Sequence, residues 1–333
     1  MRKLRIGVVG AGAIVRHRHV PGIAAHGGGE IVAVSNASIE SAATFCREHA
    51  PEAEVIPDWQ ALVARPDLDI VWIGTGPFLH APVTLAALEA GRHVFCQARM
   101  AESLASAQAM QQAAAQNPRL VTMLCPPPQG LENDAFIRTL LAQNKIGELR
   151  HVFLQSFNAG FLDPTQPAHW RQRREISGIQ VLTLGIYTEV LQRWVGAFTP
   201  QAARGKIFVS ERSGYRVTIP DALTVLVGFA NGATGCLEMS GVHAGPPRER
   251  IEITGTAGAL VLDFLADTIT FHPQGSGQGE HLEPPAGMRR PWRVEADFLD
   301  AVRNVEGPRP VPGFAEGLAY MEVVDRVARL LEA

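Results

Sequence analysis

Residues 6–15 read Ile-Gly-Val-Val-Gly-Ala-Gly-Ala-Ile-Val, and this stretch decides the fold of the first part of the chain. Its first four residues predict a short buried strand, and the glycines that follow predict a tight turn opening a helix. Such a turn binds a dinucleotide pyrophosphate on the amides at the helix start. Val15 replaces the usual third glycine or alanine, so we expect slightly looser helix–strand packing. The residues expected to hold the cofactor at this turn are Gly10, Gly12, Ala13 and Ile14.

The rest of the first third repeats the strand pattern and alternates it with helical patterns. Strands buried on both faces and separated by helices predict a parallel sheet with right-handed crossovers. The expected domain is a doubly wound Rossmann domain over residues 1–125. The predicted strands are 6–9, 31–34, 69–73, 93–96 and 120–124, and the predicted helices are 38–49, 58–64, 80–90 and 103–115.

Residues 126–333 have a different texture, which begins at the three prolines 126–128. Alternating, turn-bounded runs predict an α+β domain on a largely antiparallel open sheet, so the overall class is α/β with two domains. The closing helices are free to pack back on the first domain. The predicted strands are 150–157, 223–229, 235–240, 249–254 and 259–264, and the predicted helices are 131–143, 179–195, 292–304 and 314–331.

Composition excludes several classes of protein. The 333 residues carry 30 basic and 33 acidic side chains, so no basic surface for nucleic acid is expected. The four cysteines are far apart and show no metal-ligand spacing, so we expect reduced thiols, no metal and a cytoplasmic location. The N-terminal apolar run is too short and glycine-rich for a signal peptide. No stretch reaches the ~20 apolar residues of a membrane span.

The end of the second predicted strand bears on the choice of cofactor. An acidic residue there would bind the adenosine ribose and repel a 2′-phosphate. This chain has Ser35 and Asn36 instead, which can donate hydrogen bonds, and Arg16 or Arg18 could reach a phosphate. By charge the sequence favours NADP, whereas an asparagine could also serve NAD almost as well as an aspartate.

Several segments, taken in order, resemble the Gfo/Idh/MocA family of sugar and cyclitol oxidoreductases. The resemblance implies a nicotinamide ring at the domain cleft, a carbohydrate-like substrate, and an open sheet that makes a dimer or tetramer interface. The segments are the glycine turn, Gly74-Thr75-Gly76-Pro77-Phe78-Leu79-His80, residues 87–96, Trp170-Arg171 with Ser177-Gly178, and residues 253–258. By this resemblance Thr75, Gly76, His80 and Gln97 lie on the cofactor side, and His169, Trp170 and Arg171 on the substrate side.

Departures from the family pattern fall on its catalytic positions. The Glu-Lys-Pro segment is Gln97-Ala98-Arg99 here, and the helix motif has Thr183 for its aspartate and Tyr187 for its histidine. The candidate catalytic residues are therefore Tyr187, Arg99 and Thr183. Tyr187 could donate a proton if cations lower its pKa from about 10. Arg99 could stabilise an alkoxide by its charge.

Each candidate also has a purely structural interpretation. Tyr187 could belong to the core, and Arg99 could pair with an acid or a cofactor phosphate. His80 could only cap a helix, and Trp170 could only anchor its loop. Glu189 is expected to be solvated or interfacial. Further polar candidates are His169 and His243.

Three functional hypotheses follow from these residues. The first is an NAD(P)-dependent oxidoreductase of a sugar, sugar acid or cyclitol. The second is a silenced dinucleotide-binding sensor that acts through a partner. The third is an enzyme that uses the cofactor transiently for elimination, hydration or glycoside cleavage. The losses at Ala98 and Thr183 are what keep the second hypothesis open.

Overall fold

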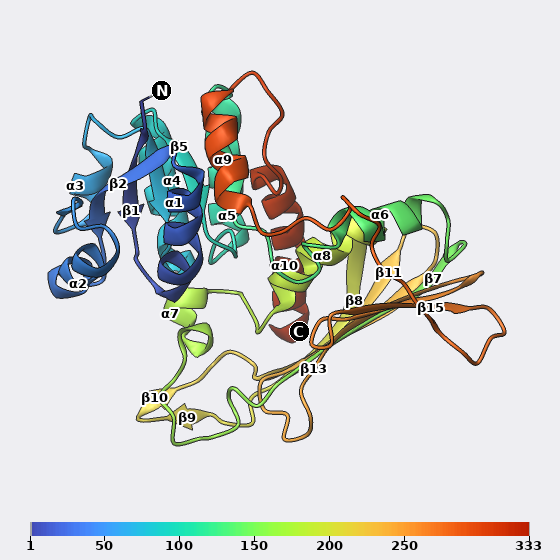
Figure 1. The fold of residues 1–333 in the computed structure, drawn as a ribbon. Helices are drawn as coiled ribbons and strands as arrows, with labels where there is room; N and C mark the ends of the chain where they lie inside the picture. Colours follow the sequence, from blue (N-terminus) through green and yellow to red (C-terminus); the bar gives the residue numbers. More distant parts are fainter. Residues whose placement is uncertain (1, 333) are drawn as a thin grey trace. The chain divides into compact units, whose positions relative to one another are not determined.

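The computed structural model describes residues 2–332, which divide into two compact units (Figure 1). Unit 1 runs to Pro126 and includes Arg293–Met321, and unit 2 contains Pro127–Trp292 and the residues from Glu322 onward. Of the two closing helices, α9 (Val294–Arg303) belongs to unit 1, while α10 (Phe314–Glu332) contributes residues to both units.

Unit 1 is built on a parallel sheet of the doubly wound type, which confirms the fold expected for the first domain. The strand order is β3-β2-β1-β4-β5-β6, and all neighbours run parallel. The order reverses between β1 and β4, so ligands bind in this fold at the carboxyl ends of those strands. The strands are β1 (Leu4–Val9), β2 (Gly29–Ser35), β3 (Glu54–Val55), β4 (Ile70–Ile73), β5 (His93–Cys96) and β6 (Thr122–Leu124).

Side-chain caps fix where several helices of unit 1 begin. Ser38, Asp58 and Ser103 each accept a hydrogen bond from a main-chain amide of the first turn. The N-cap predicted at Asp58 is thereby confirmed. The helices are α1 (Val20–His26), α2 (Ile39–His49), α3 (Trp59–Val63), α4 (His80–Glu89) and α5 (Leu104–Gln116), with a short 3-10 turn η2 (Pro77–Leu79) before α4.

The first helix begins with a π-helical turn, η1 (Val15–His19), in which the Val20 amide donates to the Val15 carbonyl. Val15 is only 1% exposed, so the packing here is not loosened as expected from the missing glycine. The reason is Gly74, because a Cβ atom there would lie 2.4 Å from Val15 Cγ2. The glycine that makes room here is therefore Gly74, directly after β4, rather than a third glycine within the turn.

Unit 2 contains an eight-stranded sheet in the order β16-β15-β14-β13-β7-β12-β11-β8. Among the described residues β7 and β12 run parallel and the other neighbours antiparallel, which confirms a largely antiparallel sheet. Its strands are β7 (Leu149–Phe157), β8 (Phe198–Lys206), β11 (Ala222–Phe229), β12 (Thr234–Ser240), β13 (Arg248–Gly255), β14 (Gly258–Asp263), β15 (Thr268–Pro273) and β16 (Glu280–His281). A separate pair is formed by β9 (Glu211–Arg212) and β10 (Tyr215–Arg216).

Helices cover one face of this sheet (Figure 1). On β7, Val152, Leu154 and Ser156 are buried, whereas Phe153 between them is 45% exposed. The alternation places the core of unit 2 on the face beneath α6 (Asp134–Ala142) and α8 (Leu184–Val195). The remaining short helices are η3 (Trp170–Gln172) and α7 (Arg174–Ser177).

The predicted helix over 179–195 begins later than expected. It starts at Leu184 because Gly178 and Leu182 have positive φ angles of 58° and 47°, which interrupt the helix. Strand β8 was not predicted, since proline, glycine and polar residues break its apolar pattern. Strand β15 was also missed, although Ile269 and Phe271 alternate with polar residues. Within residues 2–332, no helix is both long enough and apolar enough to span a membrane.

Candidate functional site

A pocket of about 410 Å³ lies at the carboxyl ends of β1 and β2 in unit 1. Of the residues predicted at the turn, Gly12 and Asn36 line it directly. Asn36 Oδ1 accepts a hydrogen bond of 3.2 Å from the Ala11 amide, which leaves its Nδ2 group as a donor. The lining residues are Ala11, Gly12, Arg16, Asn36, Ser38, Glu40, Ser41, Thr44 and Phe45.

Of the other residues predicted for the cofactor, Gly10, Ser35 and Thr75 lie together at the glycine turn. The Gly10 amide donates to the Ser35 carbonyl at 2.8 Å, which joins the turn to the end of β2. Gly10 has a φ of 85°, and a Cβ atom there would lie 2.6 Å from Thr75 Cγ2, so only glycine fits. Gly10, Ser35 and Thr75 are thus brought together, while Ala13 and Ile14 are exposed at the start of η1.

The charge of the pocket is mixed. Arg16 supplies a cation, and Ser38, Ser41 and Thr44 supply hydroxyl groups, while Glu40 supplies a carboxylate. Ser38 and Ser41 are held in a reciprocal capping arrangement at the N-terminus of α2. The residues therefore fit the adenosine-ribose end of a dinucleotide, because donors and a helix N-terminus converge on one cavity.

The segment Gln97–Met100 follows β5 and is held from several sides. The Gln97 amide donates to the Ile73 carbonyl at 3.0 Å, and the Met100 amide donates to the Tyr320 hydroxyl. The Ala98–Arg99 peptide bond is cis. Arg99 is 1% exposed, so its guanidinium group occupies a buried position rather than bulk solvent.

The His80 side chain binds the main chain of this segment and does not cap helix α4. Its Nδ1 lies 2.8 Å from the Arg99 carbonyl oxygen, and its Nε2 lies 3.0 Å from that of Thr75. The N-cap of α4 is Leu79, so the expected capping role is wrong. Burial lowers the pKa of the His80 ring, and the main-chain hydrogen bonds oppose that effect. His80 thus joins the end of β4 to the Arg99 segment.

Tyr187 is fully buried on α8, and its surroundings differ from those expected. Burial raises the pKa of its hydroxyl above the ordinary value, and the neighbouring Glu249 carboxylate raises it further. Among the described residues no cation lowers that pKa, so the proposed route to an acidic phenol is wrong. Ser156, which also faces the Tyr187 hydroxyl, lies 3.2 Å from Thr183 between their side-chain oxygens. Thr183 and Tyr187 therefore share one partner on β7.

Glu249 was not predicted as a site residue. It lies on β13 directly opposite Ser156 of β7, and burial raises the pKa of its carboxyl group. The sequence signal for it was weak, since a single acid in an alternating strand is usually exposed. Glu189, expected to be solvated or interfacial, is instead 5% exposed and lies 3.5 Å from Arg193.

The predicted substrate-side residues lie together around η3 in unit 2. His169 Nδ1 accepts a hydrogen bond of 3.1 Å from the Arg171 amide and caps this short helix. The Arg171 guanidinium stacks over the Trp170 ring at 4.4 Å, and burial lowers the pKa of Arg171. His169, Trp170 and Arg171 therefore form one compact aromatic and cationic cluster.

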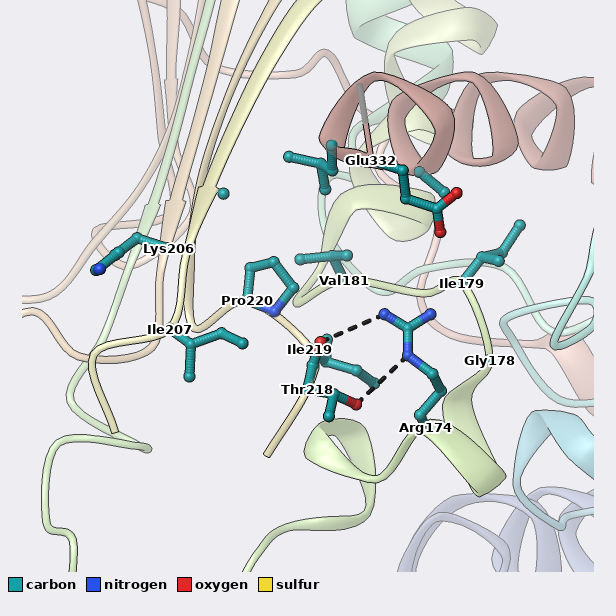
Figure 2. A pocket seen from close by; sticks show the side chains of 13 residues that line it. Arg174, Gly178, Ile179, Val181, Lys206, Ile207, Thr218, Ile219, Pro220 and Glu332 are labelled. Carbon is teal, nitrogen blue, oxygen red and sulfur yellow. Dashed lines mark hydrogen bonds between the residues drawn. The ribbon is translucent and has the colours of Figure 1, made fainter. Parts of the chain in front are cut away.

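A second pocket, of about 370 Å³, lies in unit 2 and was not predicted (Figure 2). Arg174 reaches across it to Thr218, with its Nη2 3.3 Å from the carbonyl oxygen and its Nε 3.4 Å from Oγ1. Apolar walls come from Ile179, Val181, Ile219 and Pro220. The segments that form it are far apart in the sequence, so no local pattern could indicate it.

Two observations concern metal and thiol chemistry. Within residues 2–332 no three His, Cys, Asp or Glu side chains are grouped as a metal site. Cys46, Cys96 and Cys125 are free thiols and are buried. Burial raises the pKa of the Cys96 and Cys125 thiols, so both are poor nucleophiles.

Comparison with known proteins decides the family. Residues 4–124 match the model described as an oxidoreductase family with an NAD-binding Rossmann fold, and residues 135–261 match the GFO/IDH/MocA C-terminal domain. The chain belongs to the GFO/IDH/MocA oxidoreductase family. The expected resemblance is thereby confirmed.

Members of the GFO/IDH/MocA family similar to this chain are named dehydrogenases or reductases. A dTDP-3,4-didehydro-2,6-dideoxy-alpha-D-glucose 3-reductase from Streptomyces antibioticus is 30% identical over 335 residues, covering 98% of this chain and 96% of that protein. A levoglucosan dehydrogenase from Pseudarthrobacter phenanthrenivorans is 26% identical over 340 residues, covering 88% and 85%. A solved structure of levoglucosan dehydrogenase in complex with NADH has a TM-score of 0.88 and 23% identity, covering 99% and 97%.

Proposed function

We propose that this protein transfers a hydride between a nicotinamide cofactor and a sugar, sugar acid or cyclitol. The observation that carries the proposal is the pocket at the glycine turn, where Gly12, Arg16 and Asn36 converge at the strand-order reversal. Relatives named as levoglucosan dehydrogenase and as a deoxysugar reductase support the substrate class. A nicotinamide bound there would supply the hydride chemistry.

We further propose that the cofactor is NADP rather than NAD. The pocket has no carboxylate at the end of β2, where a ribose-binding acid would repel a 2′-phosphate. The free Nδ2 donor of Asn36 and the guanidinium of Arg16 can bind that phosphate. Among the described residues that line the pocket, only Glu40 carries a negative charge, which would repel the phosphate. Structures similar to this chain have been solved with NADH or NAD⁺ bound. Titration of the protein with both cofactors therefore decides between NADP and NAD.

Tyr187 is the proton donor in this proposal. Because its pKa is raised, the phenol stays neutral at pH 7 and can give a proton but cannot act as a base. In the reductive direction the phenol O–H proton passes to the carbonyl oxygen as the hydride adds to its carbon. Glu249 lies beside the phenol, and in its protonated form its carboxyl group can return a proton to the phenolate.

Arg99 supplies a fixed positive charge on the segment after β5. A guanidinium group cannot serve as a proton donor at neutral pH, but it stabilises a developing alkoxide. Its burial strengthens that effect, because the charge is less screened than at the surface. Arg99 belongs to unit 1, and Thr183, Tyr187 and the His169–Arg171 surface belong to unit 2.

The outer face of the unit 2 sheet supports a homo-oligomer. Phe153 and Leu226 on that face are 45% and 50% exposed, and both would be covered by a second copy of the sheet. We propose a dimer or a tetramer, as the family resemblance implied. Light scattering of the purified chain tests this point independently of activity.

A substrate screen tests the proposed function. The full-length protein, stripped of nucleotide, is assayed with NADPH and NADH against keto forms of cyclitols, anhydrosugars and nucleotide-linked deoxysugars. Loss of the reduced-nicotinamide absorbance with one class identifies the substrate and supports the proposal. Tight cofactor binding without turnover on any of these classes would instead support a sensor.

A further inference from the structure

His19 is a buried polar residue of unit 1 that the proposed chemistry does not use. It is 0% exposed, and both of its ring nitrogens have side-chain partners. Nδ1 lies 2.5 Å from Glu295 Oε1, and Nε2 contacts the Gln97 side-chain amide nitrogen. Glu295 and Gln97 are themselves 1% and 7% exposed. A continuous polar chain therefore links α9 to the segment that carries Arg99.

The structure provides space for this chain at a specific position. A Cβ atom at Gly22 in α1 would lie 2.4 Å from Glu295 Oε2, so the glycine lets the carboxylate reach His19. The π-helical turn, closed by the Val20 amide on the Val15 carbonyl, ends at His19 and leaves both Val15 and His19 buried. Single π turns inside helices often mark functional positions.

Aromatic rings enclose His19 and fix its orientation. Its ring centroid is 5.0 Å from that of Trp72 and 5.1 Å from that of Phe95, and these two rings stack at 3.9 Å. A polar ring in such surroundings needs its hydrogen bonds satisfied. The Cys125 thiol also contacts the Gln97 side chain, and Glu295 and Arg18 are the charged groups that act on that thiol.

The partners determine where the ring proton sits. The Glu295 carboxylate accepts only, so His19 carries its proton on Nδ1. Nε2 is then a bare acceptor, and the Gln97 amide N–H donates to it. This orients the Gln97 carbonyl oxygen away from His19. Gln97 is also bound through its main-chain amide to Ile73, so its side chain and main chain are both fixed at the start of the Arg99 segment.

We propose that Glu295 and His19 form a positioning pair that sets the Gln97 amide, and through it the Gln97–Met100 segment. Its functional consequence rests on the proposed function, because Arg99 is the alkoxide-stabilising group there. Gln97 is essential to the arrangement. A glutamate at that position has no amide N–H to donate to His19 Nε2.

Nitrogen NMR of the full-length protein with labelled histidine and arginine tests the pair directly. The His19 signals are those lost in His19→Asn, and the Arg99 signal is the one lost in Arg99→Lys. Wild-type His19 is expected to be neutral, with the proton on Nδ1. In Gln97→Glu, which lacks the amide N–H, the His19 Nε2 signal is expected to shift. In Glu295→Ala the Arg99 Nε signal is expected to shift.

Two controls separate positioning from general damage. His93→Asn removes another unit 1 histidine, which accepts from the Val121 amide and does not contact Gln97, and should leave the His19 and Arg99 signals unchanged. Glu295→Gln keeps the acceptor oxygen and should restore the Arg99 signal toward its wild-type position, even if His19→Asn fails to fold.

Cofactor titration links the pair to function and can fail separately. We expect Glu295→Ala to weaken NADP⁺ binding about tenfold. This loss corresponds to one charge-assisted hydrogen bond that no longer orders the Gln97–Met100 segment. A wild-type His19 with both nitrogens protonated, an unshifted His19 Nε2 signal in Gln97→Glu, or an unshifted Arg99 in Glu295→Ala would overturn the proposal. A wild-type protein that binds no nicotinamide cofactor would overturn the proposed function while leaving the histidine result intact.

Discussion

Val15 packs against Gly74, and the valine side chain fits because residue 74 has no Cβ atom. Val15 fills the position that a small residue takes in the glycine turn, and Gly74 at the end of β4 supplies the missing space. Val15 begins η1, after the turn that follows β1, and Gly74 follows β4, which is paired in parallel with β1 up to Val9 and Ile73. The dinucleotide turn is therefore preserved by a compensating pair rather than by the usual three glycines.

Gly74→Ala should destabilise unit 1. The added Cβ would lie 2.4 Å from Val15 Cγ2 and 2.3 Å from the Gly10 carbonyl oxygen. Overpacking of this kind costs ~1–3 kcal/mol, and the backbone contact prevents relief by repacking. Urea unfolding measures the loss. Gly277→Ala is the matched control, since nothing lies within 4 Å of a Cβ atom there, and equal stability of both variants would contradict the account.

Asn36→Asp should reverse the cofactor preference. The new carboxylate would repel a 2′-phosphate and accept from the ribose hydroxyls, so we expect NADP⁺ affinity to fall at least ~10-fold and NAD⁺ affinity to rise. Arg16→Ala should weaken NADP⁺ alone. Arg119→Ala, an exposed arginine of unit 1 outside the pocket, serves as the control. Calorimetric titrations in which Arg16→Ala weakens both cofactors equally would remove Arg16 from phosphate recognition.

Tyr187→Phe should lower turnover while leaving cofactor affinity nearly unchanged. Removal of a general acid costs ~10²–10⁴-fold in rate, and the ring itself remains packed. Tyr215→Phe is the control, because that hydroxyl binds Glu175 at 2.7 Å near the surface of unit 2. Steady-state rates of the two variants decide the matter: a Tyr187→Phe variant as fast as wild type would exclude Tyr187 from the mechanism.

Glu249 predicts how stability depends on pH. Its pKa in the folded protein is raised by burial, so folding is favoured when the group is protonated and disfavoured when it is ionised. The favourable contribution is complete below the ordinary value of 4.5 and is lost as the pH rises through the raised value. Glu249→Gln should therefore gain stability relative to wild type as the pH rises.

Chemical unfolding at several pH values measures this difference. Glu252→Gln lies on the opposite face of the same strand, beside Arg250 at 3.0 Å, and should show no such trend. A constant difference between wild type and Glu249→Gln across the range would show that the carboxyl group is not destabilised by burial.

The sequence predicted the parts of the fold that local patterns encode. The strand–turn–helix at residues 6–15 and the N-cap at Asp58 depend on neighbouring residues, and both are present in the structure. The start of α8 was missed, because Leu182 adopts a positive φ that its residue type does not signal. Strand β8 was missed, because its stability comes from pairing with β11 rather than from its own apolar pattern.

The candidate site was harder to predict because its contacts are long-range. Tyr187 was a candidate from its helix, but Glu249, which raises its pKa together with burial, comes from β13 and is placed by the sheet register. His19 and Glu295 are 276 residues apart, and no spacing rule joins them. Sequence patterns indicated candidate residues such as Tyr187. The contacts that shift the pKa of such a residue or orient its side chain were visible only in the tertiary structure.

Deuterium transfer from labelled cofactor tests the central claim most directly. Full-length protein is incubated with NADPH or NADH deuterated at the transferable position and with keto forms of cyclitols, anhydrosugars and nucleotide-linked deoxysugars, and the products are analysed by mass spectrometry. The account predicts a carbohydrate alcohol that carries the deuterium with wild type and far less of it with Tyr187→Phe. Cofactor that binds tightly yet transfers no label to any of these carbohydrates would contradict it.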